Sequence, residues 1–336
     1  MNWNNLNIQQ LFTPIALNSL LQKIKIPNLF FVNQIFSKKK TTYDAYLANS
    51  FLENDNEVAT PTPETAEATV LANKDIRETA DKLPIFREKK LLTFESLHNY
   101  DYAIKWEIAS TLANKIEAMK KRILMAKEYM CSQVLTQFKI VYNNYTNDFG
   151  GKNSHKKKIT NNADKWATAG GAKILEDLST AVDTIKKDYG IAPNTLILGA
   201  NVLNTFLLCE EIQKIYTNRR YVIGEIAPEE NYVGNIFING CDLKIYTTSN
   251  TITNNNNEIN LLNPNTTIVM NRDECYFVNR IPPYLNQLYS MNKIEYDKEN
   301  IYITKSISDD PQGIWLFSYY SGIPQINLDS VYVIEQ

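Results

Sequence analysis

The chain has few of the residues on which most metal and catalytic sites depend. It contains only 2 histidines, His98 and His155, and 4 cysteines that stand far apart, at positions 131, 209, 241 and 275. Because no CxxC pair or other zinc-ligand spacing occurs, we expect no zinc site. We expect the cysteines to be reduced, buried thiols of a cytoplasmic protein.

Long apolar runs are also missing. No segment reaches the roughly 18 to 20 consecutive apolar residues that a membrane span requires. The stretch MNWNNLNIQQLFTPIALNSLL at the start has no basic region, and Pro14 and Asn18 interrupt its apolar residues. We therefore expect a soluble, unsecreted protein without a membrane partner.

Neither sign of charge is in excess. The chain carries 35 Lys and Arg against 37 Asp and Glu, a formal net charge of −2, and its pI is near 5.9. This average charge gives no reason to expect a phosphate-binding footprint. What the chain does have is apolar material: 44% of its 336 residues are hydrophobic, enough for one large core or two linked ones.

Catalytic motifs are incomplete wherever they begin. Asp148-Phe149-Gly150 spells the metal-binding tripeptide of protein kinases, but no His-Arg-Asp loop or glycine-rich loop precedes it. Gly150-Gly151-Lys152-Asn153 lacks the Ser or Thr of a phosphate-binding loop. We predict no catalytic residues, no cofactor, no cofactor-binding residues and no metal ligands.

Neither histidine is predicted to act as the base of a catalytic nucleophile–base pair. His155 lies in a Lys-rich and Asn-rich tract that indicates an exposed connection, and His98 lies near the start of a predicted helix. We therefore predict that the protein is not an enzyme. An α/β enzyme whose site is made of Asp, Glu, Lys and Tyr without His remains the alternative from another class.

The first quarter of the chain has no sign of a core of its own. Residues 1–36 alternate apolar clusters with Asn and Gln, which predicts an extended arm that lies on another surface. Residues 37–93 contain no glycine and are rich in acidic side chains, with the stretch Thr60-Pro61-Thr62-Pro63 in the middle. Such a segment either stays mobile or packs on a partner, so we predict an extended loop.

A single long helix follows, predicted from Asn99 to Tyr142. Apolar residues recur there at spacings of three, four or seven, and neither Gly nor Pro interrupts them. The helix would be roughly 65 Å long. The opposite face carries Lys115, Lys120, Lys121, Arg122 and Lys127, which indicate either a solvated helix face or a functional patch.

The rest of the chain reads as α/β. A second amphipathic helix contains Leu175 to Tyr189 and stops at Gly190, and Asn239-Gly240 has the positive-φ residues of a type I′ hairpin turn. We predict a helical stretch at Asn201–Thr217 and strands at Thr195–Leu198, Asn235–Ile238, Leu243–Thr247, Thr266–Met270, Glu274–Val278, Ile301–Ser306, Ile314–Tyr320 and Val331–Ile334.

Three local stretches and this order of parts resemble a known family. The first stretch is Leu29-Phe30-Phe31. The second runs from the strand TLILG through NVLNTFLL and EEIQKI to Thr217-Asn218-Arg219-Arg220, and the third is Asp310-Pro311 followed by GIWLFSYY and a closing apolar strand. The sequence is similar to the major capsid proteins of tailed bacteriophages, specifically the lambda-type major head protein E family with the Hong Kong 97-like fold.

The resemblance implies an α+β capsid fold made of four parts. These are an N-terminal arm (1–36), an extended loop (37–93), a peripheral domain with the spine helix (94–168 and 285–320) and an axial domain (169–284 and 321–336). The loop's acidic side chains are opposite in charge to the helix's Lys-bearing face. We expect intersubunit contacts at Leu29, Phe30, Phe31, Glu53, Glu57, Glu64, Glu67, Lys120, Lys121, Arg122, Arg219 and Arg220.

The implied function is structural. Copies of the chain would assemble in the host cytoplasm into hexamers and pentamers of an icosahedral phage head, the virion capsid, enclosing double-stranded DNA without sequence-specific contacts. Scaffolding, decoration and portal proteins are further partners of such shells. The shell of a gene-transfer particle or of an encapsulin-like nanocompartment is the open alternative with the same fold.

Overall fold

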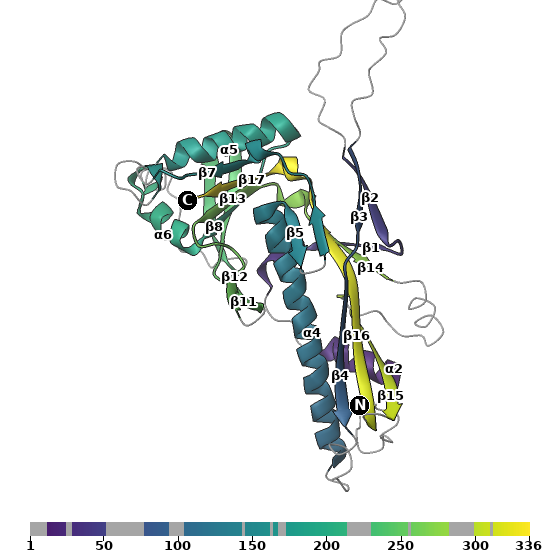
Figure 1. The fold of residues 1–336 in the computed structure, drawn as a ribbon. Helices are drawn as coiled ribbons and strands as arrows, with labels where there is room; N and C mark the ends of the chain where they lie inside the picture. Colours follow the sequence, from purple (N-terminus) through teal and green to yellow (C-terminus); the bar gives the residue numbers. More distant parts are fainter. Residues whose placement is uncertain are drawn as a thin grey trace, which may run out of the picture. The chain divides into compact units, whose positions relative to one another are not determined.

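A computed structural model (Figure 1) describes residues 12–24, 29–51, 77–93, 104–142, 145–161, 164–166, 173–213, 230–254, 257–281, 299–309 and 312–336. The chain divides into two compact units, each built from three separate stretches. Unit 1 comprises Met1–Tyr46, Lys82–Glu128 and Tyr276–Pro324; unit 2 comprises Leu47–Asp81, Tyr129–Cys275 and Gln325–Gln336.

A five-stranded mixed sheet organises unit 1. Its order is β1-β14-β16-β15, and β4 also pairs with β16, which is long enough at 14 residues to take several partners. β1 and β14 are parallel, whereas β4 and β15 run antiparallel to β16. The strands are β1 (Lys38–Thr42), β4 (Ile85–Thr93), β14 (Tyr276–Arg280), β15 (Tyr302–Asp309) and β16 (Gln312–Gln325).

The long helix is α4 (Ile104–Gln137), 34 residues, of which those up to Glu128 belong to unit 1. The predicted apolar stripe is confirmed over much of its length, because Leu112, Ile116, Met119, Ile123, Met130 and Val134 are all buried. The predicted start, Asn99–Ala103, lies outside the described residues.

The predicted end of this helix at Tyr142 is wrong. Phe138 adopts φ 61°, in the left-handed region that ends a helix, and Lys139–Tyr142 is the strand β5, paired with β6 (Tyr145–Asp148). Gly151, further along the chain, leaves room for the Phe138 ring, which a Cβ at that position would strike.

The N-terminal part of unit 1 is more folded than an extended arm. α2 (Pro14–Lys23) starts at Thr13, whose hydroxyl accepts the Ala16 N–H, and it has proline at its first position. Asn18 on this helix donates to the Ile303 carbonyl and accepts the Ile303 N–H, so it closes part of the outer edge of β15. A single π-helical turn, η2 (Phe31–Ile35), follows.

Within the predicted loop 37–93, two segments belong to the five-stranded sheet. Lys38–Thr42 is β1, and Ile85–Thr93 is β4, with Leu83 and Leu92 buried. The prediction of a loop without a core is therefore wrong for these two segments. Between them, β2 (Tyr46–Phe51) and β3 (Arg77–Lys82) form a two-stranded sheet of their own, and residues 52–76 lie outside the described part.

Unit 2 contains a six-stranded sheet in the order β7-β17-β13-β8-β10-β9. β8 is parallel to β10 and β17 to β7, and the other neighbours are antiparallel. The strands are β7 (Lys156–Lys158), β8 (Thr195–Gly199), β9 (Tyr232–Ile238), β10 (Cys241–Thr248), β13 (Thr266–Met270) and β17 (Val331–Glu335). A separate hairpin pairs β11 (Thr251–Asn254) with β12 (Asn257–Asn260).

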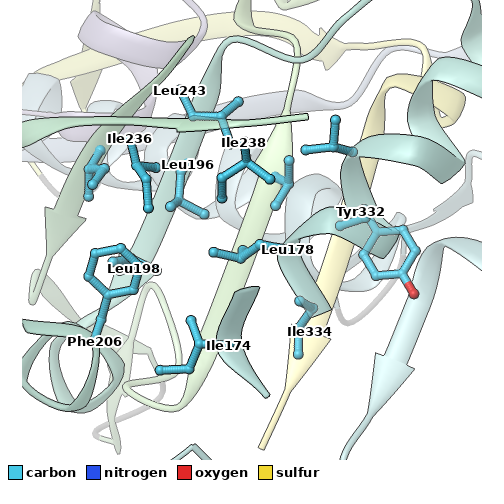
Figure 2. Packing of buried hydrophobic residues seen from close by; sticks show 14 of the residues in the cluster. Ile174, Leu178, Leu196, Leu198, Phe206, Ile236, Ile238, Leu243, Tyr332 and Ile334 are labelled. Carbon is cyan, nitrogen blue, oxygen red and sulfur yellow. The ribbon is translucent and has the colours of Figure 1, made fainter. Parts of the chain in front are cut away.

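Two helices, α5 (Ile174–Tyr189) and α6 (Ala200–Leu208), pack on this sheet. Figure 2 shows their side chains meeting those of the strands: Ile174 and Leu178 of α5 and Phe206 of α6 lie against Leu196, Leu198, Ile236 and Ile334. Short 3-10 turns complete the unit at η3 (Asn153–His155), η5 (Arg272–Glu274) and η6 (Leu328–Ser330).

Two elements of unit 2 that were predicted from their turn and cap residues, the end of α5 and the β9–β10 hairpin, are confirmed. α5 ends where Gly190 adopts φ 79°, and the β9–β10 hairpin turns at Asn239 (φ 46°) and Gly240 (φ 79°). The predicted helical stretch Asn201–Thr217 is interrupted, because α6 ends at Leu208 with Cys209 in extended geometry. Its residues from 214 onward lie outside the described part.

Candidate functional site

The polar face of α4 was predicted to be a solvated face or a functional patch, and the structure divides it. Lys121 and Arg122 are exposed; the Arg122 side chain is 70% exposed and its Nε lies 2.9 Å from the Glu88 carboxylate on β4. Lys120 and Lys127 are instead buried, at 2% and 0% exposure, which corrects the prediction for these two residues.

The buried Lys120 and the partly buried Lys115 bind their own chain. The Lys120 ammonium donates to the Leu21 carbonyl at the end of α2 (2.8 Å), and that of Lys115 donates to the Leu91 carbonyl on β4 (2.7 Å). Burial lowers the pKa of Lys115, with a smaller contribution from Lys90. These lysines hold α4 to α2 and β4, so their chemistry is used inside the subunit.

Lys127 is the centre of a buried ionic cluster in unit 1. Its ammonium lies 2.7 Å from the Glu299 carboxylate, which also binds Lys39 of β1 at 2.5 Å. The same ammonium lies over the rings of Phe277 and Tyr320, 4.9 and 4.8 Å from their centroids. Burial raises the pKa of Glu299, but the two lysines outweigh it and hold that pKa below its ordinary value.

The apolar residues predicted to contact a neighbour lie in the interior of unit 1. Leu29, Phe30 and Phe31 are at most 1% exposed, and Phe30 and Phe31 stack edge to face. The other predicted contact residues, Glu53, Glu57, Glu64, Glu67, Arg219 and Arg220, lie outside the described residues. Of the predicted set, the structure leaves Lys121 and Arg122 on the surface.

Sequence reasoning missed a basic and aromatic face on the sheet of unit 1, in which Arg87, Lys89 and Phe317 are exposed and Tyr319 is buried. Lys89 of β4 lies over the Trp315 ring (4.9 Å to the centroid), and Arg87 lies over the Tyr319 ring (5.4 Å). Phe317, between the two rings along β16, is 37% exposed. In a strand, alternate side chains lie on the same face, so the spacing of these residues in 85–93 and 312–320 could have indicated the face. This holds only if residues 85–93 are first recognised as a strand.

The histidine that sequence analysis placed in an exposed connection is fully buried. His155 has one ring nitrogen 2.8 Å from the Val331 carbonyl and the other 2.9 Å from the Asp188 carboxylate. Both ring nitrogens are therefore occupied by the chain itself, which is the arrangement of a structural histidine. His98 lies outside the described residues.

Groups for metal or small-molecule chemistry do not gather in the described part of the chain. No set of three His, Cys, Asp or Glu side chains there is placed to hold a metal ion. The four cysteines are free thiols, three of them buried and Cys209 partly exposed. A hollow of about 300 Å³ beside α5 is lined by both Lys157 and Asp177, but Lys157 and the Trp166 indole already bind the Asp177 carboxylate.

Membrane insertion finds no support in the described helices. None of them combines the length and the apolar character that crossing a bilayer would require.

Solved structures share this fold over nearly the whole chain. A protein assigned as the capsid protein of an Escherichia coli prophage superposes with a TM-score of 0.59 at 15% identity, covering 98% of this chain and 99% of that chain. A phage-related protein from Bordetella bronchiseptica gives 0.55 at 11% identity, covering 96% and 97%. The capsid of a native GTA particle gives 0.51 at 9% identity, covering 93% and 91%.

The sequence comparison identifies the family. A search of curated proteins returned no match. The family model for phage major capsid protein E matches residues 16–321, which includes most of both units and the whole of α4. The predicted α+β Hong Kong 97-like fold and the predicted structural, non-enzymatic function are confirmed. The chain belongs to the phage major capsid protein E family, whose members build the head of the virion.

Proposed function

We propose that copies of this chain assemble in the host cytoplasm into hexamers and pentamers of an icosahedral shell that encloses double-stranded DNA. Residues 94–168 and 285–320 form the peripheral domain in this proposal, and residues 169–284 and 321–336 the axial domain. Residues 1–36 act as an arm, and the part of residues 37–93 between β1 and β4 acts as an extended loop. Scaffolding, decoration and portal proteins are the further partners.

One observation carries the proposal that subunits interlock. β2 and β3 pair only with each other among the described strands, and they join neither of the two larger sheets. A two-stranded sheet alone is marginally stable in water. A ribbon of this kind therefore needs support from outside, and in a shell the available surface is a neighbouring copy of the chain.

Charge indicates where the loop docks. The sequence between the two strands contains one base, Lys74, and six acidic residues: Glu53, Asp55, Glu57, Glu64, Glu67 and Asp75. Exposed cations of unit 1 offer the complement, among them Lys121 and Arg122 on α4 and Arg87 and Lys89 on β4. Each exposed pair contributes only about 0 to 1 kcal/mol, but shell symmetry repeats each of them in every subunit.

Charge reversal tests this docking. In Glu64→Lys/Glu67→Lys, the docked loop would place like charges together, so particles should form more slowly. Because exposed charges are screened beyond about 8 to 10 Å at physiological salt, wild-type assembly should also weaken as ionic strength rises. Light scattering during assembly measures both effects. Glu258→Lys, an exposed position on β12, is the matched control. Assembly that ignores salt and charge reversal would remove the docking proposal.

Cargo distinguishes the phage head from other shells of the same fold. The structural likeness to a GTA particle capsid supports a gene-transfer particle as the second candidate. Particles purified from the native host should protect double-stranded DNA against nuclease if either proposal holds. Phage-genome DNA supports the first, random host fragments support the second, and a protein cargo without DNA would contradict both.

The arm can be tested without damaging the core. α2 is buried in unit 1 through Leu17 and Leu21, so a deletion must stop before Pro14. Removing residues 1–11 leaves α2 and its Thr13 cap intact. We expect fewer closed particles from this variant with an unchanged unfolding midpoint. Assembly equal to that of the full chain would show that these residues are dispensable.

A further inference from the structure

Glu128 is an ionisable side chain buried where α4 meets the N-terminal segment. It is 1% exposed. Its Oε1 accepts the Phe31 N–H at 2.8 Å and its Oε2 accepts the Val32 N–H at 2.9 Å. Both donors belong to the first turn of η2, so one carboxylate joins the two segments through both of its oxygens.

No other charge among the described residues balances this carboxylate. The segment NLFFVNQIFS, residues 28–37, contains no ionisable side chain. On α4, the neighbouring Lys127 directs its ammonium to Glu299, and Lys120, two turns earlier, directs its own to the Leu21 carbonyl. Cys131, one turn later, is a buried thiol, and Lys121, two turns earlier, is exposed.

Protonation changes what Glu128 can do. The ionised carboxylate accepts both N–H bonds but keeps a full charge out of water. The neutral acid loses acceptor capacity on the oxygen that carries the proton, and it removes the cost of the buried charge. Burial is the larger effect and raises the pKa of Glu128 from 4.5 to about 7, although the backbone N–H groups of Phe31, Val32 and Phe30 act to lower it.

We propose that Glu128 is a proton-dependent anchor, which holds residues Leu29–Phe36 against α4 more firmly in mildly acidic than in mildly alkaline solution. The site is contained in one chain, so the proposal stands apart from shell assembly. If residues 1–36 also act as an intersubunit arm, proton uptake at Glu128 sets how firmly that arm is rooted in its own subunit.

The sign follows from linkage. When the segment leaves α4, Glu128 returns to water and to its ordinary pKa near 4.5, whereas in the docked state the pKa is about 7. A pKa that is higher in the docked state gives stability that is complete below pH 4.5 and is lost as the pH rises through 7. Between pH 5.5 and 8.5, the docking equilibrium should weaken by roughly 30-fold.

Hydrogen exchange of the full-length, unassembled chain measures this equilibrium locally. Exchange in the peptide that covers Leu29–Phe36 is recorded at pH 5.5 and 8.5, each divided by the exchange rate of an unstructured peptide at that pH. Wild-type protection should fall by roughly 30-fold between the two conditions. In Glu128→Gln, whose side chain stays neutral, the protection should not change with pH. Glu117→Gln, an exposed position on α4, should behave as wild type.

A spectroscopic titration keeps the test valid if Glu128→Gln does not fold. The infrared band of a protonated carboxyl group should be present in the wild-type protein at pH 6 and absent at pH 8.5. Protection of Leu29–Phe36 that is equal at both pH values, the same pH dependence in a folded Glu128→Gln protein, or no carboxyl band at pH 6 would each overturn the proposal.

Discussion

Replacing Lys127 by methionine should destabilise unit 1 more than any exposed substitution on α4. Methionine keeps the apolar stem of the lysine but removes its ammonium, which lies 2.7 Å from the Glu299 carboxylate. Glu299 is 3% exposed, so water does not replace the lost partner. Lys39 remains as a second cation at 2.5 Å, with a side chain that is 30% exposed.

The magnitude follows from these contacts. Removing one member of a buried ion pair costs about 3 to 5 kcal/mol, because the other charge is left buried without compensation. Lys39 compensates part of the Glu299 charge, so we expect about 3 kcal/mol, at the lower end. The double variant Lys127→Met/Glu299→Gln removes both charges and should recover part of this loss, which makes the pair strongly non-additive.

The loss of stability in Lys127→Met should depend on pH and should be smaller in acid. In the wild type, the pKa of Glu299 lies below its ordinary value, so its ion pairs stabilise the fold above about pH 4.5 and lose this contribution as the pH falls. The difference between wild type and Lys127→Met should therefore be largest near neutral pH and shrink in acid, because Glu299 takes up its proton first in the variant and only at a pKa below 4.5 in the wild type.

Urea unfolding of the unassembled chain, followed by circular dichroism at pH 4 and pH 7, measures these differences. Lys121→Met, on the exposed face of the same helix, is the control and should change the free energy of unfolding by less than about 0.5 kcal/mol. The reasoning fails if Lys127→Met unfolds like the control, or if the double variant loses the sum of the two single losses.

Three further variants test separate parts of the fold by their unfolding midpoints. Ile116→Asp places a carboxylate in the core under α4 and should cost several kcal/mol; a wild-type midpoint would show that the stripe faces solvent. His155→Ala removes the ring whose nitrogens contact the Val331 carbonyl and the Asp188 carboxylate and should cost about 2 to 3 kcal/mol, whereas an unchanged midpoint would show that neither contact matters. Gly199→Ala should be destabilising, because the new Cβ would strike the Pro264 carbonyl oxygen; no loss would mean that the backbone relaxes there.

Elements that are coded by a few neighbouring residues could be predicted from the sequence. The β9–β10 hairpin depends on Asn239-Gly240, which adopts the positive φ angles of its turn, and α5 depends on its apolar face and on Gly190. β13 was predicted with its observed bounds, Thr266–Met270. In each case, the propensity of the local sequence and the burial in the fold favour the same structure.

The helix end shows where local patterns fail. The spacing of Phe138 and Tyr142 continues the apolar stripe of α4, so periodicity alone extends the helix through them. In the structure, Phe138 turns into the left-handed region, its carbonyl accepts the Phe149 N–H, and Gly151 makes space for its ring. These partners are 11 and 13 positions away in the sequence, and no helical pattern contains them.

The charged residues of α4 could be located but not interpreted. Lys120, Lys127 and Glu128 lie on a helix that also carries the exposed charges Glu117, Lys121 and Arg122, and composition predicts a solvated face. Their burial depends on partners brought from far away in the chain: the Leu21 carbonyl, Glu299 and the Phe31 N–H. The sequence offers no signal for such pairs, because their partners are mostly backbone groups.

The proposal of an interlocked shell is tested most directly by cryo-electron microscopy of the purified, assembled chain. We predict closed icosahedral particles of hexamers and pentamers, in which the β2–β3 ribbon of each subunit lies on an adjacent copy near Lys121 and Arg122. A monodisperse small oligomer, or a particle in which each ribbon contacts only its own subunit, would contradict this account.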